Sequence, residues 1–391
     1  MVSRRDYLAS VGAVSVLSGC LSTLNGVPDL TEPVRPVETD NWYRTGANNA
    51  NTNRGFGRSR TFDLNELVTQ FDGNPHDVTG IVERNEKVYI STSSSVHALS
   101  ESTSWTREMF EEGTSWPREI SGENTTGLVT GNDSLYVPTL ERLYNLDAET
   151  GRVRWEYDVS PANATPLLSD QYIFVEDATG PAVHCLNIET NELNWVHEFD
   201  QQTPTGLAVL AGQLYVTVSD STGSKLVAID VKSGERSFSS DALPQTAVSP
   251  VVSEDRIVVG HRNGTISVLS ETADVQQTVT IDSDENGILT PMAADAEHVF
   301  TTSESSGSIC AIRTQTGEVR WETPFSRSVV PPIVCDDSVY FFATDGQVTE
   351  HKVDTGEILS QAKIGTDPSM AAYLRDSILV GTWDQLSIIK P

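Results

Sequence analysis

A short acidic loop holds the residues that come nearest to a metal site. The segment Asp282-Ser283-Asp284-Glu285-Asn286-Gly287 spaces carboxylate and amide oxygens two residues apart and ends in a turn-forming glycine. Ca²⁺ prefers hard oxygen ligands in this spacing. A bidentate glutamate belongs at the twelfth position of such a loop, but Ala293 stands there. We therefore predict an acidic surface loop over 282–287, with a calcium site as the alternative.

Other catalytic and metal-binding patterns are missing from the sequence. The seven histidines show no His-x-His or His-Glu-x-x-His spacing for zinc. No Gly-x-Ser-x-Gly elbow is present, and Gly55-Phe56-Gly57 lacks the third glycine of a dinucleotide loop. The sequence therefore nominates no catalytic, cofactor-binding or metal-ligating residue.

The first twenty residues contain two motifs of protein export. Arg4 and Arg5, followed by an aromatic residue and leucine, resemble the twin-arginine signal for folded proteins. The apolar run over 11–17 is too short to span a bilayer. Leu17-Ser18-Gly19-Cys20 resembles a lipobox, in which cleavage leaves Cys20 to receive lipid. We predict a signal peptide over 1–19 and a cell-surface, extracytoplasmic protein held to the membrane by Cys20.

Three cysteines remain once Cys20 is assigned to lipidation. Cys185, Cys310 and Cys335 are far apart in the sequence, and three is an odd number for an exported chain. We predict three free thiols that are buried within strands as small apolar side chains. A disulfide between Cys310 and Cys335 is the alternative.

Charge excludes one class of partner. Asp and Glu number 55 against 26 Lys and Arg, and the formal net charge of −29 repels nucleic-acid phosphates. The bases are 20 Arg and only 6 Lys. Such acidity with little lysine resembles proteins of salt-loving archaea, in which salt screens the self-repulsion. An ordinary acidic extracellular protein is the alternative.

The region after the signal divides into a tether and a long folded domain. Pro28, Pro33 and Pro36 stand among polar residues that cannot form a core, so we assign 20–60 to a lipidated tether and leader. Residues 61–391 contain an internal repeat of about forty residues, which decides the fold.

The repeat shows first as a short strand with an aromatic or apolar triplet. It occurs eight times, each time after a polar pair that suits a tight turn. Its copies are Val88-Tyr89-Ile90, Leu135-Tyr136-Val137, Ile173-Phe174-Val175, Leu214-Tyr215-Val216, Ile257-Val258-Val259, His298-Val299-Phe300, Val339-Tyr340-Phe341 and Ile378-Leu379-Val380.

A second turn recurs between the third and fourth expected strands of each unit. Gly or Asn at a fixed place supplies positive φ, Asp or Thr can bond the turn's own backbone, and an aromatic residue begins the fourth strand. The residues that carry this pattern are Asp147, Thr150, Gly151, Trp155, Thr190, Trp195, Asp230, Gly234, Thr316, Gly317, Trp321, Asp354 and Gly356. In the last copy, Ser360 replaces the aromatic residue.

Four short antiparallel strands repeated eight times predict an all-β, eight-bladed β-propeller. The eighth unit supplies only three strands before the chain stops at Pro391. We predict that Leu64 to Phe71 adds the missing strand and closes the last blade, because closure removes exposed sheet edges.

The Asp-x-x-Thr-Gly-x-x-x-Trp turn resembles the pyrroloquinoline-quinone (PQQ)-like β-propeller repeat. The opening segment around Trp42 and Gly46 also resembles the leader found ahead of such repeats. The resemblance covers about 40–391. It weakens at Thr272-Ala273, which lacks the glycine, and over 101–123, where unit one carries an irregular insertion.

With a lipid anchor, the chain is most similar to the lipoprotein branch of that family, which includes BamB. This resemblance implies a non-enzymatic scaffold: a monomeric propeller that binds an envelope or membrane protein. Quinoprotein dehydrogenases resemble the same fold but bring an adjacent cysteine pair and a calcium ion, so we expect no PQQ here. A quinone-dependent oxidoreductase and a surface solute-binding protein are the alternatives.

Overall fold

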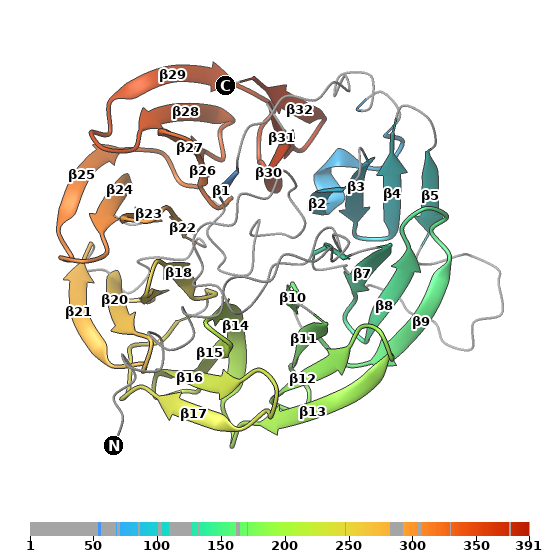
Figure 1. Ribbon diagram of the computed structural model, residues 1–391. Helices are drawn as coiled ribbons and strands as arrows, with labels where there is room; N and C mark the ends of the chain where they lie inside the picture. The colour runs from blue at the N-terminus through green and yellow to red at the C-terminus, as the bar shows by residue number, and fades with distance from the viewer. Residues whose placement is uncertain are drawn as a thin grey trace, which may run out of the picture.

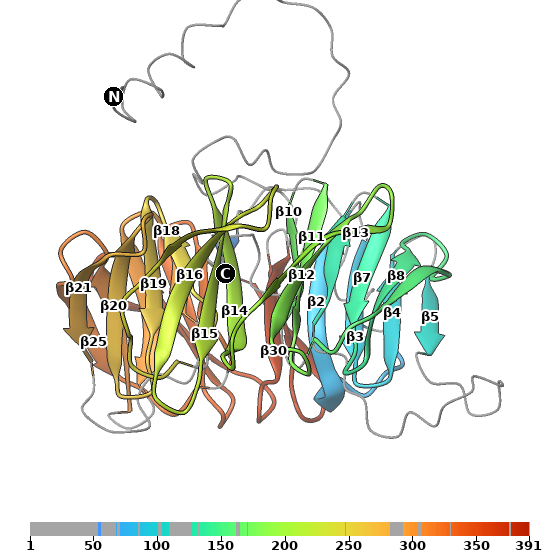
Figure 2. The same cartoon turned by 90° about the horizontal axis from the view of Figure 1, so that it is seen from below.

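The computed structural model describes residues 54–55, 68, 71–84, 87–100, 104–108, 127–131, 133–161, 165–169, 171–246, 248–281, 292–303, 307–328, 330–374 and 377–390. Within them, eight β-sheets stand around a common axis like the blades of a propeller (Figure 1). Seen from the side, the strands run between the two faces of the ring (Figure 2). The predicted all-β, eight-bladed architecture is confirmed.

Each blade runs from an inner strand beside the axis to an outer strand at the rim. In chain order, blades one to four consist of β2 (Val78–Arg84), β3 (Lys87–Thr92), β4 (Ser95–Leu99) and β5 (Trp105–Glu108); β6 (Val129–Gly131), β7 (Ser134–Pro138), β8 (Arg142–Asp147) and β9 (Val153–Asp158); β10 (Leu167–Ser169), β11 (Tyr172–Asp177), β12 (Ala182–Asn187) and β13 (Glu192–Glu198); β14 (Thr203–Leu210), β15 (Gln213–Ser219), β16 (Ser224–Asp230) and β17 (Arg236–Ser239).

Blades five to eight follow the same plan. They consist of β18 (Val251–Ser253), β19 (Arg256–Gly260), β20 (Thr265–Ser270) and β21 (Val275–Thr280); β22 (Ala293–Ala294), β23 (His298–Ser303), β24 (Ser308–Arg313) and β25 (Val319–Pro324); β26 (Ile333–Cys335), β27 (Ser338–Phe342), β28 (Gln347–Lys352) and β29 (Ile358–Lys363); β30 (Met370–Leu374), β31 (Ser377–Gly381) and β32 (Leu386–Ile389). A 3₁₀ helix, η1 (Pro75–Asp77), leads into blade one.

The apolar triplets lie on the second strand of every blade, as their spacing predicts. Strands such as β3 and β7 are buried at every residue, because a neighbouring blade covers each face. The outer strand β9 alternates instead: it exposes Arg154, Glu156 and Asp158 and half-buries the residues between them. The core therefore consists of the interfaces between blades.

The ring closes where blade eight meets blade one. One hydrophobic core continues from β2 and β3 into β30 and β31, and includes Ile81, Ile90, Ala372 and Leu379. The inner strands β2 and β30 are also in contact. Side-chain packing across this junction closes the propeller.

The predicted closing strand over 64–71 lies mostly outside the described residues. Val68 is helical and Phe71 is coil, so the prediction is wrong for the two residues that are described. The Phe71 amide donates to the Val68 carbonyl in a local turn, and the Phe71 ring lies 4.8 Å from that of His97 in blade one. Both side chains are half-buried and pack against the hydrophobic core that blades eight and one share.

Blade seven gains an unexpected inner strand. β1 (Arg54–Gly55), from the predicted leader, pairs in parallel with β26, with Arg54 opposite Val334 and Gly55 opposite Cys335. Blade seven thus has five strands, in the order β1-β26-β27-β28-β29.

The three described cysteines are buried and none forms a disulfide, as predicted, and Cys310 and Cys335 belong to different hydrophobic cores. Burial raises the pKa of the Cys185 thiol to about 12. A thiol with so high a pKa is a weak nucleophile at neutral pH. These cysteines fill space within the blades.

Candidate functional site

The predicted turn residues lie at the joints between the third and fourth strands. In blade two, Asp147 Oδ1 accepts hydrogen bonds from the Glu149 amide and from both the amide and the hydroxyl of Thr150, at 2.8–3.1 Å. Asp230 makes the same set of bonds to Lys232 and Ser233 in blade four. These side chains replace missing backbone partners within the turn.

Asp147 also forms an ion pair along the outer strand. The Arg154 guanidinium donates to Asp147 Oδ2 over 2.6 Å. This bond, followed by the bonds from Thr150, lowers the pKa of the Asp147 carboxyl to about 2. Asp147 therefore carries its charge as part of the turn.

The copies in blades three, six and seven vary this pattern. The Thr190 amide donates to Asn187 Oδ1 over 3.1 Å, and the Thr316 hydroxyl accepts from the Glu318 amide over 3.4 Å. In blade seven, Lys352 occupies the place of Asp147, and its carbonyl accepts from the Gly356 amide over 2.9 Å. Asp354 lies two residues beyond that place and is exposed.

One residue of each such turn has a left-handed backbone. Four are the predicted glycines, and two are replacements; their φ angles are 68° at Gly151, 60° at Asn191, 73° at Gly234, 62° at Ala273, 69° at Gly317 and 69° at Gly356. At Gly234, a Cβ atom would lie 2.6 Å from the Trp195 ring of the preceding blade. Glycine there allows both the turn and the close approach of the indole.

Two of the three predicted tryptophans tie one blade to the next. Trp195 in blade three donates its indole N–H to the Val231 carbonyl in blade four over 2.9 Å, and Trp321 in blade six donates to Val353 in blade seven over 2.7 Å. Trp155 packs on Tyr136 with ring centroids 5.9 Å apart. These predicted residues therefore form structural joints, and they do not converge on one binding site.

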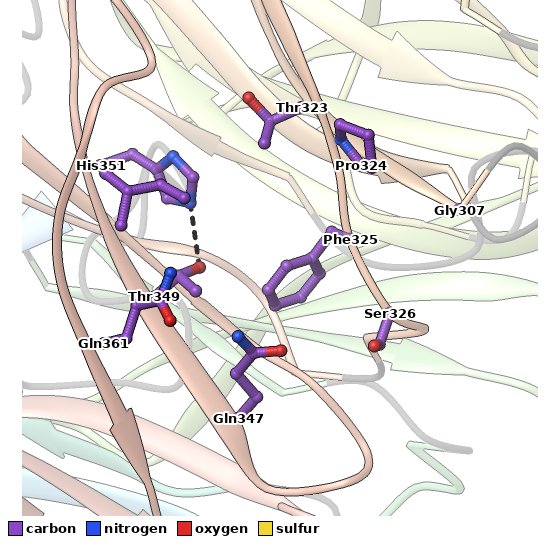
Figure 3. Close-up of a pocket in the computed structure, with 10 residues that line it drawn as sticks. Gly307, Thr323, Pro324, Phe325, Ser326, Gln347, Thr349, His351 and Gln361 are labelled. Carbon is purple, nitrogen blue, oxygen red and sulfur yellow. Dashed lines mark hydrogen bonds between the residues drawn. The ribbon is translucent and has the colours of Figure 1, made fainter.

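A groove between blades six and seven, which the sequence analysis missed, is the candidate site (Figure 3). It has a volume of about 430 Å³ and lies between the end of β25 and strands β28 and β29. Its lining residues are Gly307, Thr323, Pro324, Phe325, Ser326, Gln347, Thr349, His351, Ile358 and Gln361.

The groove is open because of one small residue. Two residues after the joint tryptophan, blade two has Tyr157 and blade three has His197, whereas blade six has Thr323. The Tyr157 hydroxyl bonds to His184 in blade three over 2.8 Å, and His197 bonds to the Gly234 carbonyl in blade four over 2.8 Å. The Tyr157 side chain thus spans the space that Thr323 leaves open, whereas the Gly356 carbonyl, which corresponds to that of Gly234, is bonded by His351. The small residue at this position can be found from the sequence by aligning the repeats on their tryptophans.

Two polar side chains of the groove have fixed roles as hydrogen-bond donor or acceptor. His351 Nδ1 lies 3.0 Å from the Gly356 carbonyl oxygen, which can only accept, so Nδ1 carries the proton. His351 Nε2 then accepts from the Thr349 hydroxyl over 2.9 Å. Burial lowers the pKa of His351 and keeps the ring neutral. The Thr349 oxygen therefore offers only lone pairs to a bound molecule.

A hydroxyl beside an imidazole is the first element of a nucleophilic site. Here the lowered pKa makes His351 a weaker base. Its other nitrogen is held by a carbonyl, whereas a carboxylate would stabilise the imidazolium that forms when a base takes a proton. The arrangement is better suited to binding than to acyl transfer.

The outer strand β29, which borders the groove, is open to solvent. All six of its residues are exposed, including Ile358 at 44% and Leu359 at 49%. Ser360 stands where blades two, three and six have the joint tryptophan, and its hydroxyl donates to Glu350 within the same blade. Trp383, 56% exposed, lies on the turn of blade eight whose backbone bonds to Thr366, just beyond β29. We call β29 and Trp383 the open rim.

The export and metal predictions lie outside the described residues: Arg4, Arg5, Cys20 and the loop 282–287. Within the part of the chain that is described, no cluster of three His, Cys, Asp or Glu side chains could hold a metal ion. No helix in that part is long and apolar enough to cross a membrane.

Comparison with known proteins places the repeat in a family. A family model described as outer membrane protein assembly factor BamB matches residues 92–323 and 245–382, two overlapping ranges that together cover most of the chain. No curated protein matches the sequence.

Solved structures share the fold at low sequence identity. BamB from Moraxella catarrhalis is 15% identical, with a TM-score of 0.64, over 82% of this chain and 97% of that chain. The computationally designed Ika8 protein is 14% identical, with a TM-score of 0.66, over 82% and 98%. A europium-containing methanol dehydrogenase is 12% identical, with a TM-score of 0.64, over 88% and 90%. These likenesses show the fold alone. The family model and the blade joints together establish that the chain belongs to the PQQ-like β-propeller family described by BamB.

Proposed function

We propose that this protein is a lipid-anchored, cell-surface scaffold whose single propeller binds an envelope protein without catalysing a reaction. The observation that carries the proposal is the open rim. β29 is an outer strand with every side chain exposed, and an edge of this kind can pair with an extended segment of another chain. Leu359 adds exposed apolar surface on that strand, and Trp383 adds more on the turn that bonds to Thr366, beyond the end of β29.

The composition of β29 supports a binding role. Natural sheet edges that avoid association carry charges, prolines or bulges that block pairing. Five of the six residues of β29 are uncharged, and Lys363 comes only at its end. A bulge interrupts the pairing with β28 beside Ile358, which leaves the stretch from Ser360 onward as the regular edge.

Family membership and the N-terminal motifs support the setting. A family model described as an assembly factor fits a protein that binds other proteins, and Cys20 after a lipobox-like tetrad would hold the propeller at a membrane surface. The neutral, weakly basic His351 supports the non-enzymatic part of the proposal.

Site-specific photocrosslinking in native membranes tests the proposal. A photoreactive amino acid in place of Leu359 should yield one discrete crosslinked partner. Leu193 is the matched control, because it is 47% exposed on the outer strand of blade three, whose Trp195 is in place. With the photoreactive residue at position 359, we expect Ala362→Lys, which adds a charge to the same exposed strand, to abolish the product without lowering the melting temperature. Equal crosslinking at both positions, or none at either, would refute a role for the open rim.

A further inference from the structure

We propose that the groove between blades six and seven binds a neutral carbohydrate, with the Phe325 ring as its stacking platform. This site shares Ile358 and Gln361 with β29 but lies between blade seven and blade six, whereas the proposed function uses the unpaired backbone edge of that strand. Its volume of about 430 Å³ falls within the range of small-molecule sites.

The first argument is charge. The protein carries a formal net charge of −29, yet none of the ten described lining residues has a charged side chain when His351 is neutral. A charged ligand would find no opposite charge there and would lose its hydration without compensation. The groove therefore suits an uncharged molecule.

The second argument is the kind of polar group present. Gln347 and Gln361 bring carboxamides that both donate and accept, and Thr323 and Ser326 bring hydroxyls that do the same. Thr349 is fixed as an acceptor by its bond to His351. A sugar hydroxyl, which donates and accepts at once, matches this set, and one that donates to Thr349 would be oriented by it.

The third argument is the apolar surface. Phe325 packs on Phe341 with ring centroids 6.0 Å apart and is only half-buried. Figure 3 shows its ring beside Gln347 within the groove. A flat ring flanked by carboxamides fits the apolar face and polar edge of a pyranose. A peptide would be expected to use a row of apolar pockets for alternate side chains.

Saturation-transfer NMR on the purified protein tests this proposal with maltotriose, cellotriose, mannotriose and triacetylchitotriose as neutral probes, and with digalacturonic acid as the charged probe. At least one neutral trisaccharide should bind and digalacturonic acid should not. Phe325→Ala and Gln361→Leu should each weaken binding by about tenfold. Gln361 is exposed, so that variant retains the fold.

The repeat supplies a matched pair of controls. Thr323→Tyr places in blade six the residue that spans the equivalent space from blade two, and it should abolish binding. Tyr157→Thr opens the equivalent space between blades two and three and should leave binding unchanged. The proposal is overturned if no neutral trisaccharide binds, or if binding survives Thr323→Tyr in a folded protein. It is also overturned if an unstructured peptide displaces the sugar and Phe325→Ala leaves the affinity for the sugar unchanged.

Discussion

The indole N–H of Trp321 in blade six donates to the carbonyl oxygen of Val353 in blade seven over 2.7 Å. The same ring lies against Gly356, where a Cβ atom would approach it to 2.6 Å. Trp195, Val231 and Gly234 repeat this joint between blades three and four. A turn that is local in sequence thus also fixes how adjacent blades pack.

The joint makes Gly234 doubly sensitive to substitution. Gly234→Ala should lose about 1 kcal/mol from the left-handed backbone and a further ~1–3 kcal/mol from the clash with Trp195. Gly212 is the control, since its φ is 76° but nothing lies within 4 Å of an added Cβ. Gly212→Ala should therefore show only the backbone cost. Equal losses in denaturant unfolding would contradict the role of the indole contact.

The pKa of Asp147 gives the turn a defined pH dependence. Arg154 and Thr150 hold this pKa at about 2, below the ordinary 3.8, so the folded state favours the carboxylate. Its stabilising contribution is fully present above about pH 4 and is lost as the pH falls towards 2. Asp147→Asn should lower the melting temperature at pH 6, and the difference should narrow below pH 4. Arg154→Gln should behave alike, and a difference independent of pH would contradict the ion pair.

The repeat could be predicted from the sequence because its signals are local. An apolar triplet after a polar pair specifies a buried strand after a tight turn, and eight copies specify eight blades. The residue with positive φ in the second turn could also be predicted from its glycine or asparagine. Ala273, which stands in the place of that glycine, still adopts a φ of 62°. There the neighbouring strands impose the turn on a residue that does not favour it.

The groove and the open rim depend on residues that belong to different blades. Ser360 was visible as a missing aromatic residue, but its effect on β29 becomes clear only when blade eight is placed beside it. Thr323 matters only because it lines the same groove as His351 and Gln347 of the next blade. The closing strand was predicted from the missing fourth strand of unit eight, and Phe71 instead packs its ring against His97.

The N-terminal motifs predict a processed, lipidated protein. Mass spectrometry of the native protein should find Cys20 as the first residue, with a lipid adduct. Cys20→Ser should release the protein or leave it unprocessed, and replacing Arg4 and Arg5 by Lys should block export. An intact Met1 on the mature surface protein would refute this assignment.

The acidic surface predicts a stability that depends on salt. At neutral pH the formal net charge is −29, and the excess carboxylates repel one another. The screening length grows from about 3 Å at 1 M salt to about 10 Å at 0.1 M, so this repulsion strengthens in dilute buffer. The purified protein should therefore melt at a lower temperature, or aggregate, in dilute buffer. Near the sequence isoelectric point of about 4.4, the net charge vanishes and this salt effect should shrink. If salt raises the melting temperature equally at both pH values, the charge is not the cause. Salt that is excluded from the protein surface would then explain the effect, because it strengthens the burial of apolar groups whatever the protein's charge.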